Sequence, residues 1–290
     1  NGLRARPGIR PQIPPIHVAA GEQGHAGDGA VVTQHVHLTI LRRRRPRKNL
    51  LHRRPRLRQR PRFHPRHHQP QHPIGGRDDA PKTIAEADVI FIATLPEQAT
   101  SVAHNIKPFL NKDTVIVSIL AGIPIETFTN VLPDHPIARL MPNTPAQIGE
   151  GASGIAWHQV NHDKKETVLS LLRTTGVVVE VKEDDLHTVT ALSGSGPAYV
   201  YFFIEALEQA AIEQGLAQPI ARQLAVQTIK GAASMVEQTQ MDPSVLRERV
   251  TSPGGTTAAG LQQMMCGGFA DIVQNVIDAA SMRSRELGNE

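Results

Sequence analysis

The chain has 290 residues, enough for one large domain or two ordinary ones with a buried core. Its 40% hydrophobic and 20% charged residues are typical of a globular protein, and no run of about 18 apolar residues offers a membrane-spanning helix. The one cysteine, Cys266, excludes an internal disulfide framework and favours a reducing compartment. With no signal-peptide pattern at the N-terminus, these features predict a cytoplasmic protein without a membrane partner.

Charge divides the chain into two unlike parts. Residues 1–77 contain 17 Lys and Arg against two acidic residues, which leaves 14 basic and 25 acidic residues for the rest of the chain. The basic part also has 10 of the 22 prolines, which interrupt helices and strands. Dense like charges and few apolar residues predict a disordered or aberrant Arg/Pro-rich segment over residues 1–80.

Three interpretations of this basic segment remain open. The first is a translation out of the native reading frame, the second is a solvated tail, and the third is an arm that binds nucleic-acid phosphates. The glycines at 21–29 are spaced G-x-x-G-x-x-G-x-G, unlike the dinucleotide fingerprint G-x-G-x-x-G, and no amphipathic helix follows them. The segment therefore contains no recognisable phosphate cradle.

Residues 81–182 alternate short apolar runs with helix-forming stretches. Strands are predicted at 87–94, 113–120, 136–141, 154–158 and 177–181. Helices are predicted at 97–110 and 163–174, the second closed by Gly176, and Pro124 suits the first turn of a short one. Strands that alternate with helices over short connections predict an α/β fold with a parallel, doubly wound sheet.

Residues 183–290 show helical periodicity only. Pro197, Pro219 and Pro243 each open a helix, and a last helix begins near Phe269. Apolar residues recur at helical spacing, for example Val200, Phe203, Ile204, Leu207 and Ala211. Such wide stripes fit a core within one chain or a core that includes a dimer face, so a helical domain follows the sheet domain.

Two loops that follow predicted strands are candidate ligand sites. They are Ala93-Thr94-Leu95-Pro96 and Met141-Pro142-Asn143-Thr144-Pro145. Ligands of open α/β sheets lie beyond the carboxyl ends of the strands, and Asn143 offers the donor and acceptor that a carboxamide such as nicotinamide needs. Each loop taken alone also fits an ordinary rigid turn.

The run V-T-S-P-G-G-T-T-A-A-G at 250–260 is the most informative motif. Its two adjacent glycines let a ligand approach the backbone, and the helix that follows offers free N–H groups for a carboxylate. A capped turn would explain one Ser or Thr, but not S-P-G-G-T-T together. The run S-G-S-G-P at 193–197 lacks the strand–turn–helix context of a nucleophile elbow, and the spacing of the histidines at 158, 162 and 187 predicts no metal site.

Two of these motifs resemble the signatures of the pyrroline-5-carboxylate reductase family. They are L-S-G-S-G-P-A-Y at 192–199 and T-S-P-G-G-T-T at 251–257, and M-P-N-T-P at 141–145 and D-V-I-F-I-A at 88–93 agree in order and spacing. The resemblance covers residues 82–290. It implies reduction of 1-pyrroline-5-carboxylate to L-proline by NADPH or NADH, the last step of proline biosynthesis. It also implies a Rossmann-type domain and a helical dimerisation domain, and thus a homodimer or a larger oligomer of dimers.

The resemblance also assigns site residues. The substrate would be held by Ser252, Gly254, Gly255, Thr256 and Thr257, with the Thr257 hydroxyl on the ring nitrogen as the catalytic contact. The cofactor would be lined by Ala93, Thr94, Leu95, Pro96, Ala121, Gly122, Asn143 and Thr144.

Two departures from the family pattern affect the cofactor. Leu95 stands where the family usually has Lys, and the glycine fingerprint and the selector for the 2′ position should fall within residues 1–75, where neither is recognisable. The chain as written is therefore expected to bind NAD(P)H poorly, and the preference between NADH and NADPH stays open. Two alternatives remain, another reductase of the β-hydroxyacid dehydrogenase kind and an inactive homologue whose basic arm binds nucleic acid.

Overall fold

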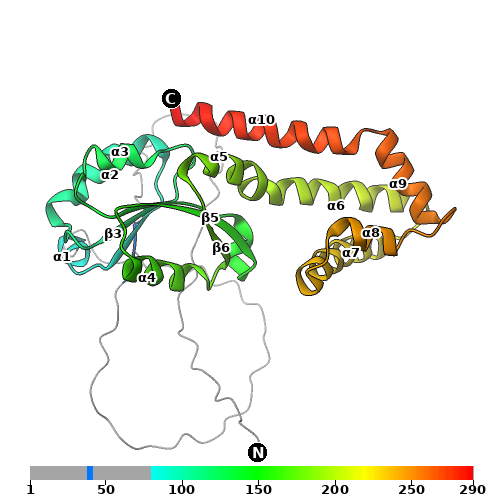
Figure 1. The fold of residues 1–290 in the computed structure, drawn as a ribbon, viewed down its shortest axis with the longest axis horizontal. Helices are drawn as coiled ribbons and strands as arrows, with labels where there is room; N and C mark the ends of the chain where they lie inside the picture. The colour runs from blue at the N-terminus through cyan, green and yellow to red at the C-terminus, as the bar shows by residue number, and fades with distance from the viewer. Residues whose placement is uncertain (1–37, 42–79, 290) are drawn as a thin grey trace, which may run out of the picture.

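The computed structural model describes residues 38–41 and 80–289, so the interpretations of residues 1–37 and 42–79 lie outside the described residues. We use "sheet domain" for residues 80–182 and "helical domain" for residues 183–289. Figure 1 shows a sheet with helices on both faces and long helices that extend away from it. Within the basic segment, β1 (Leu38–Leu41) is a strand that the sequence does not predict, so the prediction of a disordered or aberrant segment is wrong for its Leu-, Thr- and Ile-containing run.

The described part of the sheet has six strands in the order β1-β2-β3-β4-β5-β6. β2 (Val89–Ile92), β3 (Val115–Ser118) and β4 (Ile137–Met141) are parallel neighbours, which confirms the predicted core of the fold. β1 pairs antiparallel with β2, β5 (Gly151–His158) runs antiparallel to β4, and β6 (Gly176–Glu180) is parallel to β5.

A wholly parallel sheet is therefore the wrong prediction at the β4–β5 pair. The connection contains only a short 3₁₀ turn, Thr144–Ile148, whereas parallel neighbours need a crossover of a dozen residues or more. The β5–β6 pair has such a crossover in α4 (His162–Leu172), and those two strands are parallel. Connection length, rather than strand composition, decides the strand direction here.

The helices of the sheet domain differ from prediction mainly at their ends. The predicted helix at 97–110 is divided into a 3₁₀ turn (Pro96–Gln98), α2 (Ala99–Ile106) and a second 3₁₀ turn (Lys107–Phe109). Pro124 lies just before α3 (Ile125–Thr129) with extended backbone, not in its first turn. Gly176 begins β6 and does not close α4, which ends at Leu172 with Arg173 as its C-cap, while α1 (Ala80–Ala85) is unpredicted.

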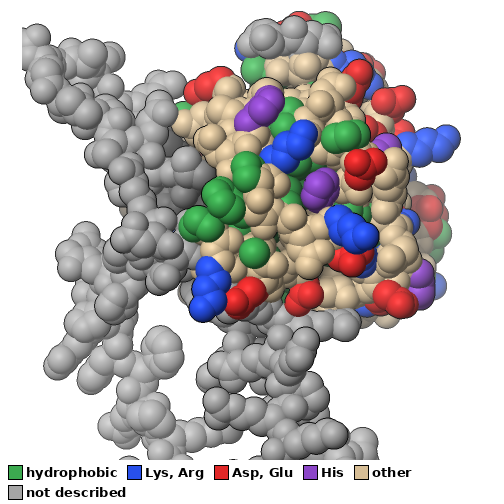
Figure 2. Space-filling view, turned by 90° about the vertical axis from the view of Figure 1, so that its left-hand side faces the viewer, with side chains coloured by type: hydrophobic (Ala, Val, Ile, Leu, Met, Phe, Trp, Pro, Cys, Tyr) green, Lys and Arg blue, Asp and Glu red, His purple; other side chains and the backbone are tan. Residues whose placement is uncertain are grey.

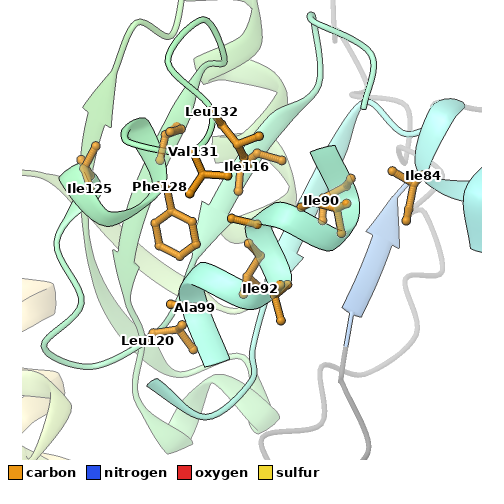
Figure 3. Close-up of a cluster of buried hydrophobic side chains, with 14 of the residues drawn as sticks. Ile84, Ile90, Ile92, Ala99, Ile116, Leu120, Ile125, Phe128, Val131 and Leu132 are labelled. Carbon is orange, nitrogen blue, oxygen red and sulfur yellow. The ribbon is translucent and has the colours of Figure 1, made fainter. Parts of the chain in front are cut away.

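Apolar clusters cover both faces of the sheet. Figure 3 shows the cluster on one face, where Ile90 and Ile116 of the strands meet Phe128 of α3 and Ala99 of α2. The cluster on the other face joins strand residues to the α4 residues Val168, Leu169 and Leu172. Burial on both faces explains why the central strands read as continuous apolar runs.

The helical domain contains α5 (Leu186–Val189), a π-turn (Thr190–Gly194), α6 (Gly196–Glu213), α7 (Gln218–Thr239), α8 (Pro243–Arg249), α9 (Thr256–Cys266) and α10 (Phe269–Asn289). The predicted proline starts are confirmed, since each of the three prolines lies in a first turn. Asp242 caps α8, because its Oδ1 accepts a hydrogen bond from the Ser244 N–H at 2.7 Å. Figure 1 shows α10 running back from α9 so that its C-terminal end lies over the sheet domain.

Many large apolar side chains of the helical domain lie at the surface. Phe202 of α6 is 72% exposed, Leu224 of α7 55% and Ile272 of α10 55%. The helical stripes are thus not buried within one chain, and extensive exposed apolar surface marks an interface. None of the described helices combines the length and apolar composition that crossing a bilayer requires.

Candidate active site

Three loops meet at one edge of the sheet. They follow β2, β3 and β4, whose carboxyl ends coincide because these strands are parallel neighbours. These loops carry all of the residues predicted to line a cofactor. Leu95, Pro96, Ala121 and Thr144 are exposed there, and Ala93, Thr94 and Asn143 are half-buried. The structure therefore brings the predicted cofactor residues to one open edge, which we call the cofactor edge.

Gly122 is the buried member of this set. Its φ of +80° favours glycine, and a Cβ at this position would lie 2.9 Å from the backbone carbon of Leu287. A Cβ on Gly288 would likewise lie 2.6 Å from the Gly122 carbonyl oxygen. The end of α10 thus packs directly against the loop after β3, and this contact accounts for the glycine without a ligand.

Asn143 is engaged by backbone groups on two sides. Its Nδ2 donates to the Ser193 carbonyl at 3.0 Å, and its Oδ1 accepts from the Ala152 N–H at 3.0 Å. Pairing with a nicotinamide carboxamide, the role suggested by the sequence, would have to use the second N–H and the second Oδ1 lone pair of the amide. The geometry instead favours a role for Asn143 in fixing the loop after β4.

The S-P-G-G-T-T loop joins α8 to α9. Gly254 has a φ of +73°, and Gly255 is the extended N-cap of α9, whose N–H donates to the Ser252 carbonyl at 3.0 Å. A Cβ on Gly255 would collide with Ser252 Oγ. Gly254 is therefore required by the loop conformation itself, whereas a Cβ at Gly255 would require the Ser252 side chain to move.

The first turn of α9 is open to a ligand. No side chain of the described residues caps it, and Ser252, Thr256 and Thr257 are exposed. Uncapped N–H groups and the positive end of the helix dipole attract a carboxylate, and the hydroxyls add donors and acceptors beside it. The predicted substrate residues therefore lie together in one loop.

The two sets of residues are not adjacent within one chain. Figure 1 shows α9 at the end of the helical domain that lies away from the sheet, whereas the cofactor edge belongs to the sheet domain. A site that uses both sets therefore needs a second copy of the chain or a rearrangement of the helices.

An ion pair between a buried arginine and a half-buried glutamate lies where the domains join, and the sequence patterns did not predict it. Arg139 of β4, whose side chain is 6% exposed, places Nη1 3.2 Å from Glu183 Oε1. The same oxygen accepts from the Ile125 N–H at 2.6 Å. The available signal was the arginine inside the apolar run P-I-A-R-L-M, because a charge in a buried strand requires a partner.

His187 of α5 belongs to the same region. Its Nδ1 lies 3.0 Å from Ser284 Oγ of α10. Burial lowers the pKa of His187 from its ordinary value of 6.5, and the nearby Arg139 and Arg285 lower it further. Elsewhere in the described residues, no group of three His, Cys, Asp or Glu side chains is placed to hold a metal ion.

The surface of the sheet domain is electrically mixed on the side that Figure 2 shows. Acidic, basic and histidine side chains are interspersed there, with apolar side chains between them. Proteins that bind nucleic acid present a concentrated basic face to the phosphates. The described part of this face has no such concentration.

A Rossmann-type sheet edge followed by a helical domain in which the first turn of α9 is uncapped is the arrangement of a two-domain reductase. Residues 183–287 match the family model described as pyrroline-5-carboxylate reductase dimerisation. The pyrroline-5-carboxylate reductase of Staphylococcus aureus (strain COL) is 37% identical over 214 residues, 73% of this chain and 79% of the relative. That of Synechocystis is 39% identical over 205 residues, 70% of this chain and 76% of the relative.

Solved structures agree with these relatives. Plasmodium falciparum pyrroline carboxylate reductase with NADP bound aligns with a TM-score of 0.67 and 36% identity, over 72% of this chain and 80% of that one. The Coxiella burnetii pyrroline-5-carboxylate reductase aligns with a TM-score of 0.68 and 35% identity, over 71% and 78%. The chain belongs to the pyrroline-5-carboxylate reductase family, as the loop motifs predict, and its helical domain is a dimerisation domain.

Proposed function

We propose that this chain reduces 1-pyrroline-5-carboxylate to L-proline with NADPH or NADH, the last step of proline biosynthesis. The observation that carries the proposal is the S-P-G-G-T-T loop, held by its two glycines at the uncapped start of α9 in a member of this family. We place the enzyme in the cytoplasm, in keeping with its single, exposed Cys266. We also set the domain boundary at residues 182 and 183, with residues 1–80 as a separate segment apart from β1, which pairs with β2.

The cofactor edge fits a nicotinamide nucleotide. It is open, it lies at the carboxyl ends of parallel strands, and its residues Leu95, Ala121 and Thr144 are exposed. Residues 93–96, 121 and 144 would hold the nucleotide, which supplies the hydride when bound. The glycine fingerprint would fall within residues 1–75, mostly outside the described residues, so the predicted weak binding of NAD(P)H stays a prediction.

The loop before α9 would hold the substrate. The N–H groups of Thr256 and Thr257 are placed to bind its carboxylate, with the Ser252 hydroxyl beside them. The Thr257 hydroxyl would hydrogen-bond the ring nitrogen. A protonated cyclic imine is already electrophilic, so orienting it contributes more than a strong protein acid would. These residues therefore bind and orient, and the mechanism uses no carboxylate pair or histidine.

The complete site would form in a homodimer, with larger assemblies built from such dimers. Support comes from the separation of the S-P-G-G-T-T loop and the cofactor edge within one chain. The exposed apolar faces of α6, α7 and α10 supply a surface for the second copy. Covering these faces would also shield the loop from water, which strengthens its hydrogen bonds to the substrate.

Thr257→Ala tests the proposal, with Thr257→Ser as the matched control. We expect Thr257→Ala to lower kcat/KM for 1-pyrroline-5-carboxylate by about tenfold to a hundredfold, the cost of about one to three kcal/mol for a lost polar contact. The serine variant should retain most of the activity because it keeps the hydroxyl. Unchanged kinetics in the alanine variant would contradict the proposed hydrogen bond of the Thr257 hydroxyl to the substrate. Faster turnover of a β-hydroxyacid with a nicotinamide cofactor would favour the alternative reductase class.

A further inference from the structure

We propose that Asn143 is a positioning residue that fixes the cofactor edge to the start of the helical domain by supplying a hydrogen bond that Pro197 cannot. The proposal rests on the proposed function and adds to it a residue that sets the relative placement of the two halves of the site.

The π-turn leaves a carbonyl group in need of a donor. The Ser195 N–H donates to the Thr190 carbonyl at 2.8 Å, which defines the wide turn, and α6 begins immediately after it. In a continuous helix the Ser193 carbonyl would accept from the N–H of residue 197. That residue is Pro197, which has no N–H, so the helix cannot satisfy this carbonyl in the usual way.

Asn143 supplies the missing donor from another domain. Its Nδ2 lies 3.0 Å from the Ser193 carbonyl oxygen, in a partly buried position. Its Oδ1 accepts from the N–H of Ala152 at the start of β5, also at 3.0 Å. One amide therefore joins the loop after β4, the strand β5 and the π-turn, and each of its two ends has a backbone partner.

Close packing on either side leaves this joint little freedom. A Cβ on Gly194 would lie 2.7 Å from Met141 Cε of β4, and a Cβ on Gly154 of β5 would lie 2.8 Å from Val189 Cγ1 of α5. Gly154 lets α5 lie directly on β5, and Gly194 leaves room for the end of the Met141 side chain. Asn143 thus supplies hydrogen bonds within a closely packed contact that is otherwise apolar.

The consequence for the reaction is geometric. The loop after β4 forms part of the cofactor edge, and α6 begins the helices that carry the substrate loop of the same chain and the dimer face. Hydride transfer requires close alignment, and a misplacement of about 1 Å far from the reacting atoms costs about a hundredfold in rate. Loosening this joint should therefore lower kcat more than it raises KM for NADPH.

A double-mutant cycle with Pro197→Ala tests the proposal. The alanine gives residue 197 an N–H that can reach the Ser193 carbonyl. We expect Asn143→Ala to lower kcat by about tenfold or more in the natural background and by several-fold less in the Pro197→Ala background. Asn143→Asp keeps the acceptor for Ala152 and nearly the same volume but turns a carboxylate oxygen toward the Ser193 carbonyl, so Pro197→Ala should rescue only part of its loss of kcat. This variant covers the case in which the alanine variant fails to fold.

The outcomes distinguish a positioning role of Asn143 from a direct contact with the cofactor. They also distinguish a failure of this proposal from a failure of the proposed function. An equal loss of kcat in both backgrounds would overturn the proposal, and so would a raised KM for NADPH with kcat unchanged, which would mark Asn143 as a direct cofactor contact. Amide hydrogen exchange of residues 194–200 provides a readout without turnover. Exchange should accelerate in Asn143→Asp and slow again in the double variant, even if the chain does not reduce 1-pyrroline-5-carboxylate. Unchanged exchange would also overturn the proposal.

Discussion

The sheet domain completes its apolar core within one chain, whereas the helical domain does not. Ile116, Phe128 and Ile137 are 0% exposed, while Phe202 is 72% and Ile272 55% exposed. Both domains carry strong apolar periodicity in sequence, so the pattern alone does not say which chain covers an apolar face. The protein therefore consists of a sheet domain that completes its own core and a helical domain whose apolar faces need a second chain to cover them.

The largest expected effect concerns the self-sufficient core. Phe128→Ala removes a fully buried ring and should lower the free energy of unfolding by about 3–5 kcal/mol. Phe109→Ala, at a position that is 40% exposed in the same domain, is the control and should cost less. Chemical denaturation of both variants measures the difference. Equal losses would contradict the view of a core closed around Phe128.

If two chains share the helical core, a charge placed on its apolar face should weaken the oligomer. Ile272→Glu places a charge on the exposed apolar face of α10, and we expect it to raise the dissociation constant of the oligomer by about thirtyfold or more, since interface anchors are worth about 2 kcal/mol each. Sedimentation velocity at several protein concentrations measures this shift. Thr100→Glu adds the same charge to the exposed face of the sheet domain and should leave the assembly intact. An oligomer that survives Ile272→Glu would show that the α10 face is not the interface.

Breaking the ion pair at the boundary between the two domains should lower stability by an intermediate amount. Glu183→Gln removes the charge opposite Arg139, whose side chain is only 6% exposed, and should cost about 1–3 kcal/mol because the buried guanidinium loses its counter-charge. Glu166→Gln breaks the exposed pair with Arg173 and should cost less than about 0.5 kcal/mol. Thermal unfolding compares the two variants. A cost as small for Glu183 as for Glu166 would show that the joint does not depend on this pair.

The smallest expected effect is a pH dependence at the same joint. Burial, with Arg139 and Arg285 nearby, holds the pKa of His187 below its ordinary 6.5, so the unfolded chain binds more protons than the folded one between these two pKa values. Stability should therefore fall as pH drops below about 6.5. His187→Gln should make stability depend less steeply on pH. The part of the dependence due to His135, whose pKa burial also lowers, should remain. Unfolding curves at several pH values in this range measure the slope, and an unchanged slope would contradict the prediction.

Much of the fold follows from local sequence signals. The apolar runs predict the parallel β2–β4 core, and the prolines at 197, 219 and 243 predict where helices begin. The antiparallel β5 is missed because the 3₁₀ turn at Thr144–Ile148 is too short for a crossover, and nothing in the strand composition itself reports direction. β1 is missed because its short run lies within a segment dominated by prolines and arginines.

The site is predictable only where one loop carries it. The glycines of S-P-G-G-T-T indicate an unusual backbone, and in the structure Gly254 has a positive φ while Gly255 lies close to the Ser252 side chain. The roles of Gly122 and Asn143 depend on partners far away in sequence, Leu287 for one and Ser193 for the other. No local sequence pattern identifies such partners, because these contacts form only when the two domains pack against each other.

The contact between Gly122 and Gly288 has a consequence for how the protein is made. The sheet domain leaves the ribosome first and can fold as a unit during synthesis. The loop after β3 cannot reach its final packing until residue 288 has also emerged, because the backbone of α10 forms its wall. The edge that would hold the nucleotide is therefore among the last parts to be finished, and a nascent chain with a complete sheet does not yet have a complete site.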